Sequence, residues 1–197
     1  MTPYSDLQID ALRELTNIGS GTAATSLSSM LGRAVDITVP NTLVLPLNEA
    51  VEAVGAAESE VTGVAIFVTG DLGATVLLIF TPDTGATLCR LLGVEPGSEI
   101  ALSALCEIGN VLGASYIGAL GSMTGLELEP SPPQAATDML GAILTTVLLG
   151  DGEDQDQALV IDTELKVENE DSCAPSFLFI PSAGGVGEML SRLGLGA

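Results

Sequence analysis

The hydrophobic positions change their period several times along the chain, and each change marks a different secondary-structure element. A period near 3.6 residues opens the sequence and stops at Gly32, which predicts a long amphipathic helix. Shorter β-rich runs follow, separated by prolines and by a glycine-containing turn typical of a hairpin. In order, the pattern predicts a helix over residues 6–31, a strand over 35–39, an extended piece between Pro40 and Pro46, a hairpin of 61–68 with 75–80, and a helix from Thr81 to about Gly93.

The second half of the chain runs through the same order of patterns. With an offset of 93 residues, positions 10–40 and 103–133 align without a gap and share 9 identical residues in 31. A match of this kind indicates an internal duplication. We therefore predict an α/β (α+β) fold in which residues 1–197 form one domain. Two pseudo-twofold-related repeats, at about 5–94 and 99–197, would share one central, mostly antiparallel sheet flanked by helices.

The main predicted difference between the two halves is an added apolar helix at 135–149 with an acidic loop at 151–156. The hydrophobic pattern of the first half predicts neither a matching helix nor a matching acidic loop. The other elements predicted for the second half are a helix over residues 99–123, a strand over 126–129, β-rich runs over 159–167 and 176–180, and a last helix over 187–193.

Polar side chains form a narrow stripe on each predicted long helix. Asp10, Glu14, Asn17 and Gly21 are spaced i, i+4, i+7 and i+11, which places them on one face of a helix, opposite its leucines. A solvated surface is the ordinary explanation for one such stripe. It does not explain the small residues beside the polar ones, nor the recurrence of the stripe 93 residues later. The second helix presents, in the same register, Ser103, Glu107, Asn110 and Ala114.

The charge composition excludes several classes of function. There are 26 acidic side chains and 5 basic ones, a net charge of −21, so nucleic acid is excluded as a direct ligand. The chain has no His, which removes His-based general base catalysis and the commonest zinc sites. Its 3 Cys form no CxxC pair and favour free thiols. The acidic excess predicts a halophilic protein adapted to high salt, with an ordinary acidic protein as the alternative.

No segment of the sequence predicts export or membrane insertion. Residues 1–9 carry Asp6 and lack both the basic start and the apolar stretch of a signal peptide. The longest apolar stretch, 139–149, is far shorter than the roughly 20 residues of a membrane-spanning helix. We therefore expect a cytoplasmic protein that makes no membrane contact. The acidic segment 151–156 lacks the glycine and glutamate positions of a calcium loop, which favours a solvated loop.

Each stripe continues to a proline at a fixed spacing, and the resulting pattern resembles a known signature. The resemblance is to the (D/S)-x3-E-x2-N-x22-P motif of the CheC/CheX/FliY phosphatases of bacterial and archaeal chemotaxis, and it covers essentially the whole chain. Two copies without a further domain are similar to the CheC members of this family. One departure is Thr16, where the second copy has Gly109. The matching segments are Asp10-x3-Glu14-x2-Asn17-x22-Pro40 and Ser103-x3-Glu107-x2-Asn110-x22-Pro133.

The resemblance implies hydrolysis of the aspartyl phosphate on the response regulator CheY. Asn17 and Asn110 would hold the attacking water, a task that suits a neutral amide because it adds no negative charge beside the phosphoryl group. Glu14 and Glu107 would contact the lysine next to the regulator's phosphorylation site. The regulator would carry the Mg²⁺, so we expect no cofactor and no metal site in this chain. The supporting motif positions would be Asp10, Pro40, Ser103 and Pro133.

Other functions of the same scaffold stay open at this level. The chain could bind and sequester phosphorylated CheY without hydrolysing it, or regulate the receptor deamidase CheD, which family members of this kind bind. The apolar segment 135–149 and its acidic loop are the predicted CheD contact. A motor-switch component is a further alternative, but it predicts the loss of one or both Asn, and both are present.

Overall fold

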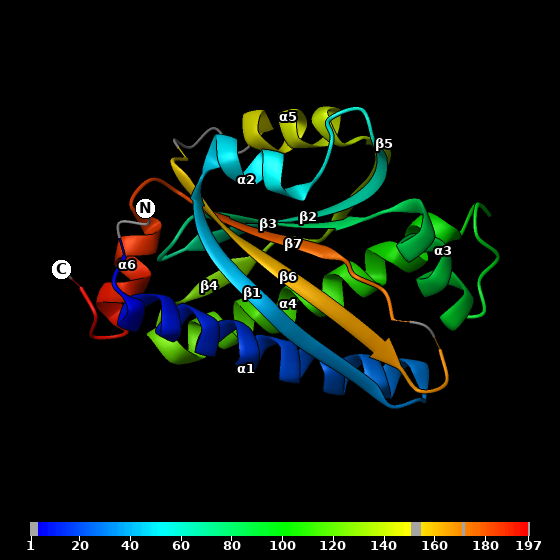
Figure 1. The fold of residues 1–197 in the computed structure, drawn as a ribbon, viewed down its shortest axis with the longest axis horizontal. Helices are drawn as coiled ribbons and strands as arrows, with labels where there is room; N and C mark the ends of the chain where they lie inside the picture. Colours follow the sequence, from blue (N-terminus) through cyan, green and yellow to red (C-terminus); the bar gives the residue numbers. More distant parts are fainter. Residues whose placement is uncertain (1–3, 151–154, 171, 197) are drawn as a thin grey trace.

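Across the residues that the structure describes, 4–150, 155–170 and 172–196, the chain forms one antiparallel sheet with helices on both faces and at both ends (Figure 1). The structure is a computed structural model. Its elements are α1 (Asp6–Leu31), β1 (Val35–Pro46), α2 (Leu47–Val54), β2 (Glu60–Gly70), β3 (Ala74–Phe80), α3 (Pro82–Leu91), α4 (Ala101–Thr124), β4 (Leu128–Pro130), β5 (Gln134–Met139), α5 (Leu140–Gly150), β6 (Gln157–Val167), β7 (Ser176–Pro181) and α6 (Gly185–Arg192).

Local capping signals set the beginning of α1 and the last turn of both long helices. At the start of α1, Ser5 and Gln8 form a capping box, in which each side chain bonds the other's backbone N–H. Helix α1 is followed by Gly32 and α4 by Gly125, with φ of 64° and 70°. Glycine adopts this left-handed conformation without the strain that a side chain brings. Both helices therefore stop where the sequence predicts.

Each half of the chain runs through helix, strand, helix, two strands and helix, except that the first strand of the second half is divided into β4 and β5. The predicted helix at 135–149 is therefore wrong over its first five residues. Residues 134–139 pair with β2 as β5, and α5 begins only at Leu140. Hydrogen bonding to β2 outweighs the local helix preference of the alanines there.

The predicted asymmetry between the two halves is also wrong. Helix α5 begins at Leu140, 93 residues after the Leu47 that begins α2, so each half has this helix. Sequence analysis did not predict α2, because its eight residues directly follow a strand that ends in proline. Of the predicted acidic loop, residues 151–154 lie outside the described residues.

The sheet interleaves the two halves of the chain. Its strand order is β1-β6-β7-β3-β2-β4, with β5 also paired to β2, and the pairings between these strands are antiparallel. The edge strands are exchanged, because β1 pairs with β6 of the second half, whereas β4 and β5 pair with β2 of the first half. The predicted single, mostly antiparallel sheet flanked by helices is thus confirmed. The repeat bounds 5–94 and 99–197 stay a prediction.

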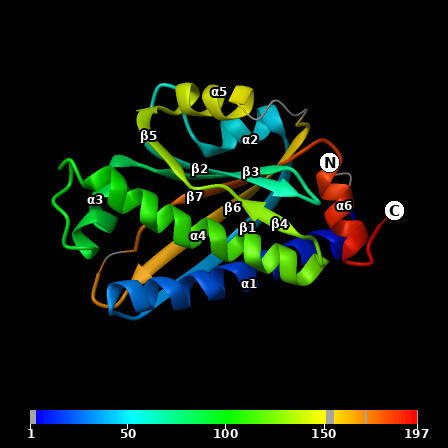
Figure 2. The same cartoon turned by 180° about the vertical axis from the view of Figure 1, so that it is seen from behind.

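Helices cover both faces of this sheet. Helices α1 and α4 lie on one face and α2 and α5 on the other, while α3 and α6 lie at opposite ends (Figures 1 and 2). Strand β3 is buried along its whole length. Its alternate side chains reach two different cores: Val76 and Leu78 pack under α1 and α4, and Leu77 and Ile79 pack under α2 and α5. Burial on both faces explains the continuous apolar run of this strand.

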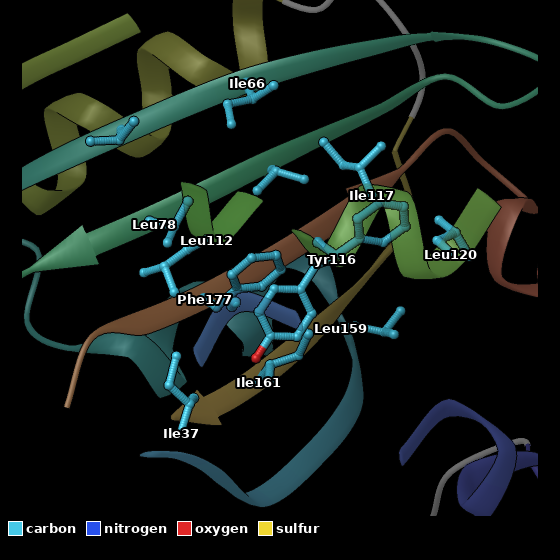
Figure 3. Close-up of a cluster of buried hydrophobic side chains, with 14 of the residues drawn as sticks. Ile37, Ile66, Leu78, Leu112, Tyr116, Ile117, Leu120, Leu159, Ile161 and Phe177 are labelled. Carbon is cyan, nitrogen blue, oxygen red and sulfur yellow. The ribbon is translucent and has the colours of Figure 1, made fainter. Parts of the chain in front are cut away.

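The two long helices pack against each other in opposite directions (Figures 1 and 2). They lie in close contact at Gly19, where an added Cβ would lie 2.5 Å from Cδ1 of Tyr116. The Tyr116 ring lies in turn 4.4 Å from that of Phe177, measured between centroids, inside the apolar cluster that Figure 3 shows. By length and composition alone, α4 could cross a membrane, but 56% of its apolar window is buried inside the fold. It serves here as a core helix.

Candidate functional site

The first polar stripe is on the outer face of α1. Leu12 and Leu15 are 0% and 5% exposed and hold the helix on the core, so the residues on the opposite side of the same turns face solvent. The side chains of Asp10, Glu14 and Asn17 are all exposed. The structure therefore places these three predicted site residues together on one surface, as the helical spacing requires.

The second polar stripe is on the outer face of α4. Ser103 and Glu107 are exposed, and Asn110 is half-buried. Ile108 and Leu112 are buried under them and fix the rotation of the helix. The second Glu–Asn pair is thus presented in the same way as the first, although its amide is less open to solvent.

The Glu and Asn side chains of both stripes are not held by the rest of the described chain. Within the described part of the chain, the side chains of these four residues make no hydrogen bond and no ion pair: Glu14, Asn17, Glu107 and Asn110. Both stripes are on outward helix faces, while the cavities beside α5 and α3 are lined by other residues. An open helix face suits the surface of another protein better than it suits an enclosed small molecule.

One cation on the first stripe has no counterpart on the second. Arg13 Nη1 lies 3.2 Å from Asp10 Oδ1, in an ion pair between two exposed side chains. On the second helix, 93 positions later in each case, Cys106 stands in place of Arg13 and Ser103 stands in place of Asp10. Burial, and then the nearby Glu107 carboxylate, raise the pKa of the Cys106 thiol. Cys106 therefore stays protonated at neutral pH, which argues against a nucleophilic role.

The packing beneath the two stripes explains why Thr16 replaces the glycine of the second copy. Thr16 is fully buried; its hydroxyl donates to the Arg13 carbonyl and lies 3.0 Å from the Thr42 hydroxyl on β1. At Gly109, an added Cβ would lie only 2.7 to 3.0 Å from the side chain of Val64 on β2. The first site thus has room for a threonine directly before its Asn, and the second has room only for glycine.

One motif proline lies within an edge strand, and the other lies in the segment that joins two strands. Pro40 is exposed and lies where the pairing of β1 with β6 shifts its register, between Thr38 and Asn41. Pro133 lies between β4 and β5, and its carbonyl accepts a hydrogen bond from the Cys106 thiol at 3.9 Å. A proline has no N–H to donate to a strand neighbour, so it suits an edge strand at an irregularity. Pro40 thus belongs to the strand that packs beside α1, and Pro133 belongs to the segment that joins β4 and β5 beside α4.

The two Glu–Asn pairs are staggered along the helix pair. Because α1 and α4 are antiparallel, Asn17 lies about 3 Å to one side of the Gly19–Tyr116 contact, and Asn110 lies about 9 Å to the other, at 1.5 Å per residue. The structure therefore keeps the two Glu–Asn pairs apart on one layer and does not bring them into one cluster. Among the described residues, no group of three or more His, Cys, Asp or Glu is placed to hold a metal ion.

The comparisons with known proteins identify the family of this chain. A model of the CheC-like family matches residues 7–44 and 100–136, two stretches that begin 93 positions apart. The CheY-P phosphatase CheC of Bacillus subtilis (strain 168) is 33% identical over 166 residues, which cover 80% of this chain and 79% of that protein. The chain belongs to the CheC-like family.

Solved structures share the fold of this CheC-like chain. FliY of Thermotoga maritima superimposes with a TM-score of 0.78 at 23% identity and covers 98% of each chain. CheX, in its CheY–BeF3–Mg²⁺ complex from Borrelia burgdorferi, gives a TM-score of 0.50 at 13% identity and covers 85% of this chain and 97% of that one. At these identities the likeness concerns the fold alone. Assignment to the CheC/CheX/FliY family is thus confirmed at the level of family and fold.

Sequence analysis missed three exposed residues on the two stripes. Arg13 stands beside Asp10, and two apolar residues, Leu7 and Ile100, are 65% and 62% exposed at the beginning of α1 and α4. The sequence did hold a signal for Leu7 and Ile100. Each lies three residues before the first residue of its stripe, Asp10 or Ser103, and this helical spacing places it on the same face.

Proposed function

We propose that this protein hydrolyses the aspartyl phosphate of a CheY response regulator at two sites, Glu14 with Asn17 and Glu107 with Asn110. One observation carries the proposal: a Glu–Asn pair on the outer face of a helix recurs in the same register on two helices of a chain that is 33% identical to a CheY-P phosphatase. A fold alone would not suffice, because one fold hosts unrelated activities.

The chemistry asked of the amides is limited to positioning. Water attacks the phosphorus, a new P–O bond forms, and the bond to the aspartyl oxygen breaks, which leaves aspartate and inorganic phosphate and releases a proton to solvent. Asn17 or Asn110 holds that water in line with the breaking bond. An amide does this without placing a charge next to the phosphoryl oxygens, whereas a carboxylate would repel them.

The glutamates dock the regulator. Each Glu precedes its Asn by three residues, so the two side chains lie about one turn apart on the same surface. An exposed carboxylate there suits a lysine beside the phosphorylated aspartate, and a charge-assisted hydrogen bond would set the distance between amide and phosphorus. Mg²⁺ belongs to the regulator in this proposal and neutralises charge on the phosphoryl group. CheD remains a predicted second partner, and the cytoplasm is the predicted location.

The decisive experiment measures loss of phosphate from CheY regulators encoded in the same genome, with and without the protein. The Asn17→Ala, Asn110→Ala double variant is expected to return the decay to that of the regulator alone, while each single variant keeps the activity of the other site. Because both side chains lie off the core, the circular dichroism spectrum and melting temperature stay unchanged. Full activity in the double variant would refute the assignment of the amides.

Two controls separate catalysis from docking. The Glu14→Ala, Glu107→Ala variant is expected to need a higher regulator concentration for half-maximal rate, with the maximal rate kept. Asn48→Ala removes an exposed amide from α2, across the sheet, and should leave both constants unchanged. If the wild-type protein binds phosphorylated regulator and slows its decay, the sequestration alternative replaces hydrolysis.

A further inference from the structure

An exposed apolar side chain precedes each glutamate by seven residues, and a second apolar side chain follows each glutamate by four residues. Leu7, Glu14 and Ile18 are spaced i, i+7 and i+11, so they form one line along the outer face of α1. The corresponding line at the start of α4 is formed, 93 positions later in each case, by Ile100, Glu107 and Val111. Each line is about 17 Å long, at 1.5 Å per residue.

The exposure of these residues has no explanation within the described part of the chain. Leu7 and Ile100 are 65% and 62% exposed and Ile18 is 41% exposed, while Val111 is half-buried against the core. Only six large apolar side chains are exposed across the described residues, and three of them lie on these two lines. Apolar residues that are exposed at matching positions of two sites point to a shared contact with a partner.

We propose that Leu7 with Ile18, and Ile100 with Val111, are the apolar contacts that seat the response regulator on the two Glu–Asn pairs. This inference rests on the proposed function, because the regulator is the occupant. The lines are continuous with the proposed sites: Glu14 and Glu107 lie between the two apolar residues of each line, so a protein that covers the glutamate also covers its neighbours. An interface of this kind has an apolar centre and a polar rim.

The charge of the chain gives these contacts a specific task. At a net charge of −21, the protein's overall charge gives little attraction to any partner that is not basic, and salt weakens the one ion pair that each glutamate could offer. Apolar contacts are not screened by salt. We therefore expect the apolar lines to carry docking affinity at high salt, with the glutamates setting the register.

The test is the Leu7→Ser, Ile100→Ser variant, assayed for phosphate release over a range of phosphorylated CheY. The half-saturating concentration should rise about tenfold, which corresponds to about 1.4 kcal/mol, and the maximal rate should stay within about twofold. The rise should persist at molar KCl. Leu7→Met with Ile100→Met keeps the apolar surface and should restore the wild-type constant. Leu43→Ser removes another exposed leucine, 43% exposed, from the opposite face of the sheet and should change nothing.

A binding measurement distinguishes this inference from the function on which it rests. CheY activated with beryllium fluoride and Mg²⁺ is titrated into the Asn17→Ala, Asn110→Ala protein, with and without the two serine substitutions. Weaker binding with the serines supports the apolar contacts, whether or not the wild type is a phosphatase. Equal binding overturns them, even if phosphatase activity is established. A change in oligomeric state without a change in regulator affinity also overturns them, because the lines would then join copies of this chain.

Discussion

Replacing Gly109 with alanine would place a methyl group against an interior strand of the sheet. The added Cβ would lie 2.7 Å from Cγ1, 2.8 Å from Cβ and 3.0 Å from Cγ2 of Val64. Rotation of the valine cannot relieve this contact, because its Cβ is fixed to the backbone of β2. Either α4 must move outward or β2 must move inward. Asn110 follows directly in the chain and would move with the helix.

The free-energy change can be worked out by comparison with Gly118, on the same helix, where an added Cβ meets nothing within 4 Å. Both substitutions gain about 1 kcal/mol of helix propensity. Overpacking at Gly109 costs about 1 to 3 kcal/mol. We therefore expect Gly118→Ala to raise the free energy of unfolding by about 1 kcal/mol and Gly109→Ala to lower it by up to about 2 kcal/mol.

Thermal unfolding and activity test this reasoning separately. At about 2 to 4 °C per kcal/mol, the melting temperature of Gly109→Ala should lie at least 2 °C below that of Gly118→Ala. In an Asn17→Ala background, where only the second site acts, Gly109→Ala should lower the dephosphorylation rate about tenfold, because a misplaced amide positions water poorly. Equal melting temperatures would refute the close approach of α4 to β2, and a full rate would refute its effect on Asn110.

Two further predictions concern stability. Tyr116 is 3% exposed, and its hydroxyl has no hydrogen-bond partner among the described residues. Tyr116→Phe should therefore raise the free energy of unfolding, measured by denaturant titration, by about 1 kcal/mol. A loss of stability would show that the hydroxyl is hydrogen-bonded. The melting temperature should climb between low and molar KCl, because 26 acidic groups repel one another and the ion pairs of the described chain are exposed. A flat profile would remove the halophilic prediction and leave the phosphatase proposal untouched.

The features that depend on helical periodicity were determined by the sequence alone. A helix repeats its faces every 3.6 residues whatever it packs against, so the leucines and the Glu–Asn pairs of residues 6–31 and 99–123 were assigned correctly to opposite sides. The glycine stops at Gly32 and Gly125 are equally local, because a left-handed φ favours glycine in any fold. The family resemblance rested on these same local spacings.

Tertiary structure decided what depends on strands from distant parts of the chain. Residues 134–139 form a strand only because β2, about 70 residues earlier, supplies the hydrogen bonds, and no local pattern records that partner. The arrangement of the strands likewise fixes which residue packs against the position before each Asn: Thr42 at the first helix and Val64 at the second. The antiparallel contact at Gly19 and Tyr116 sets the two sites apart along the helices, because helix packing depends on surfaces that only the folded chain brings together.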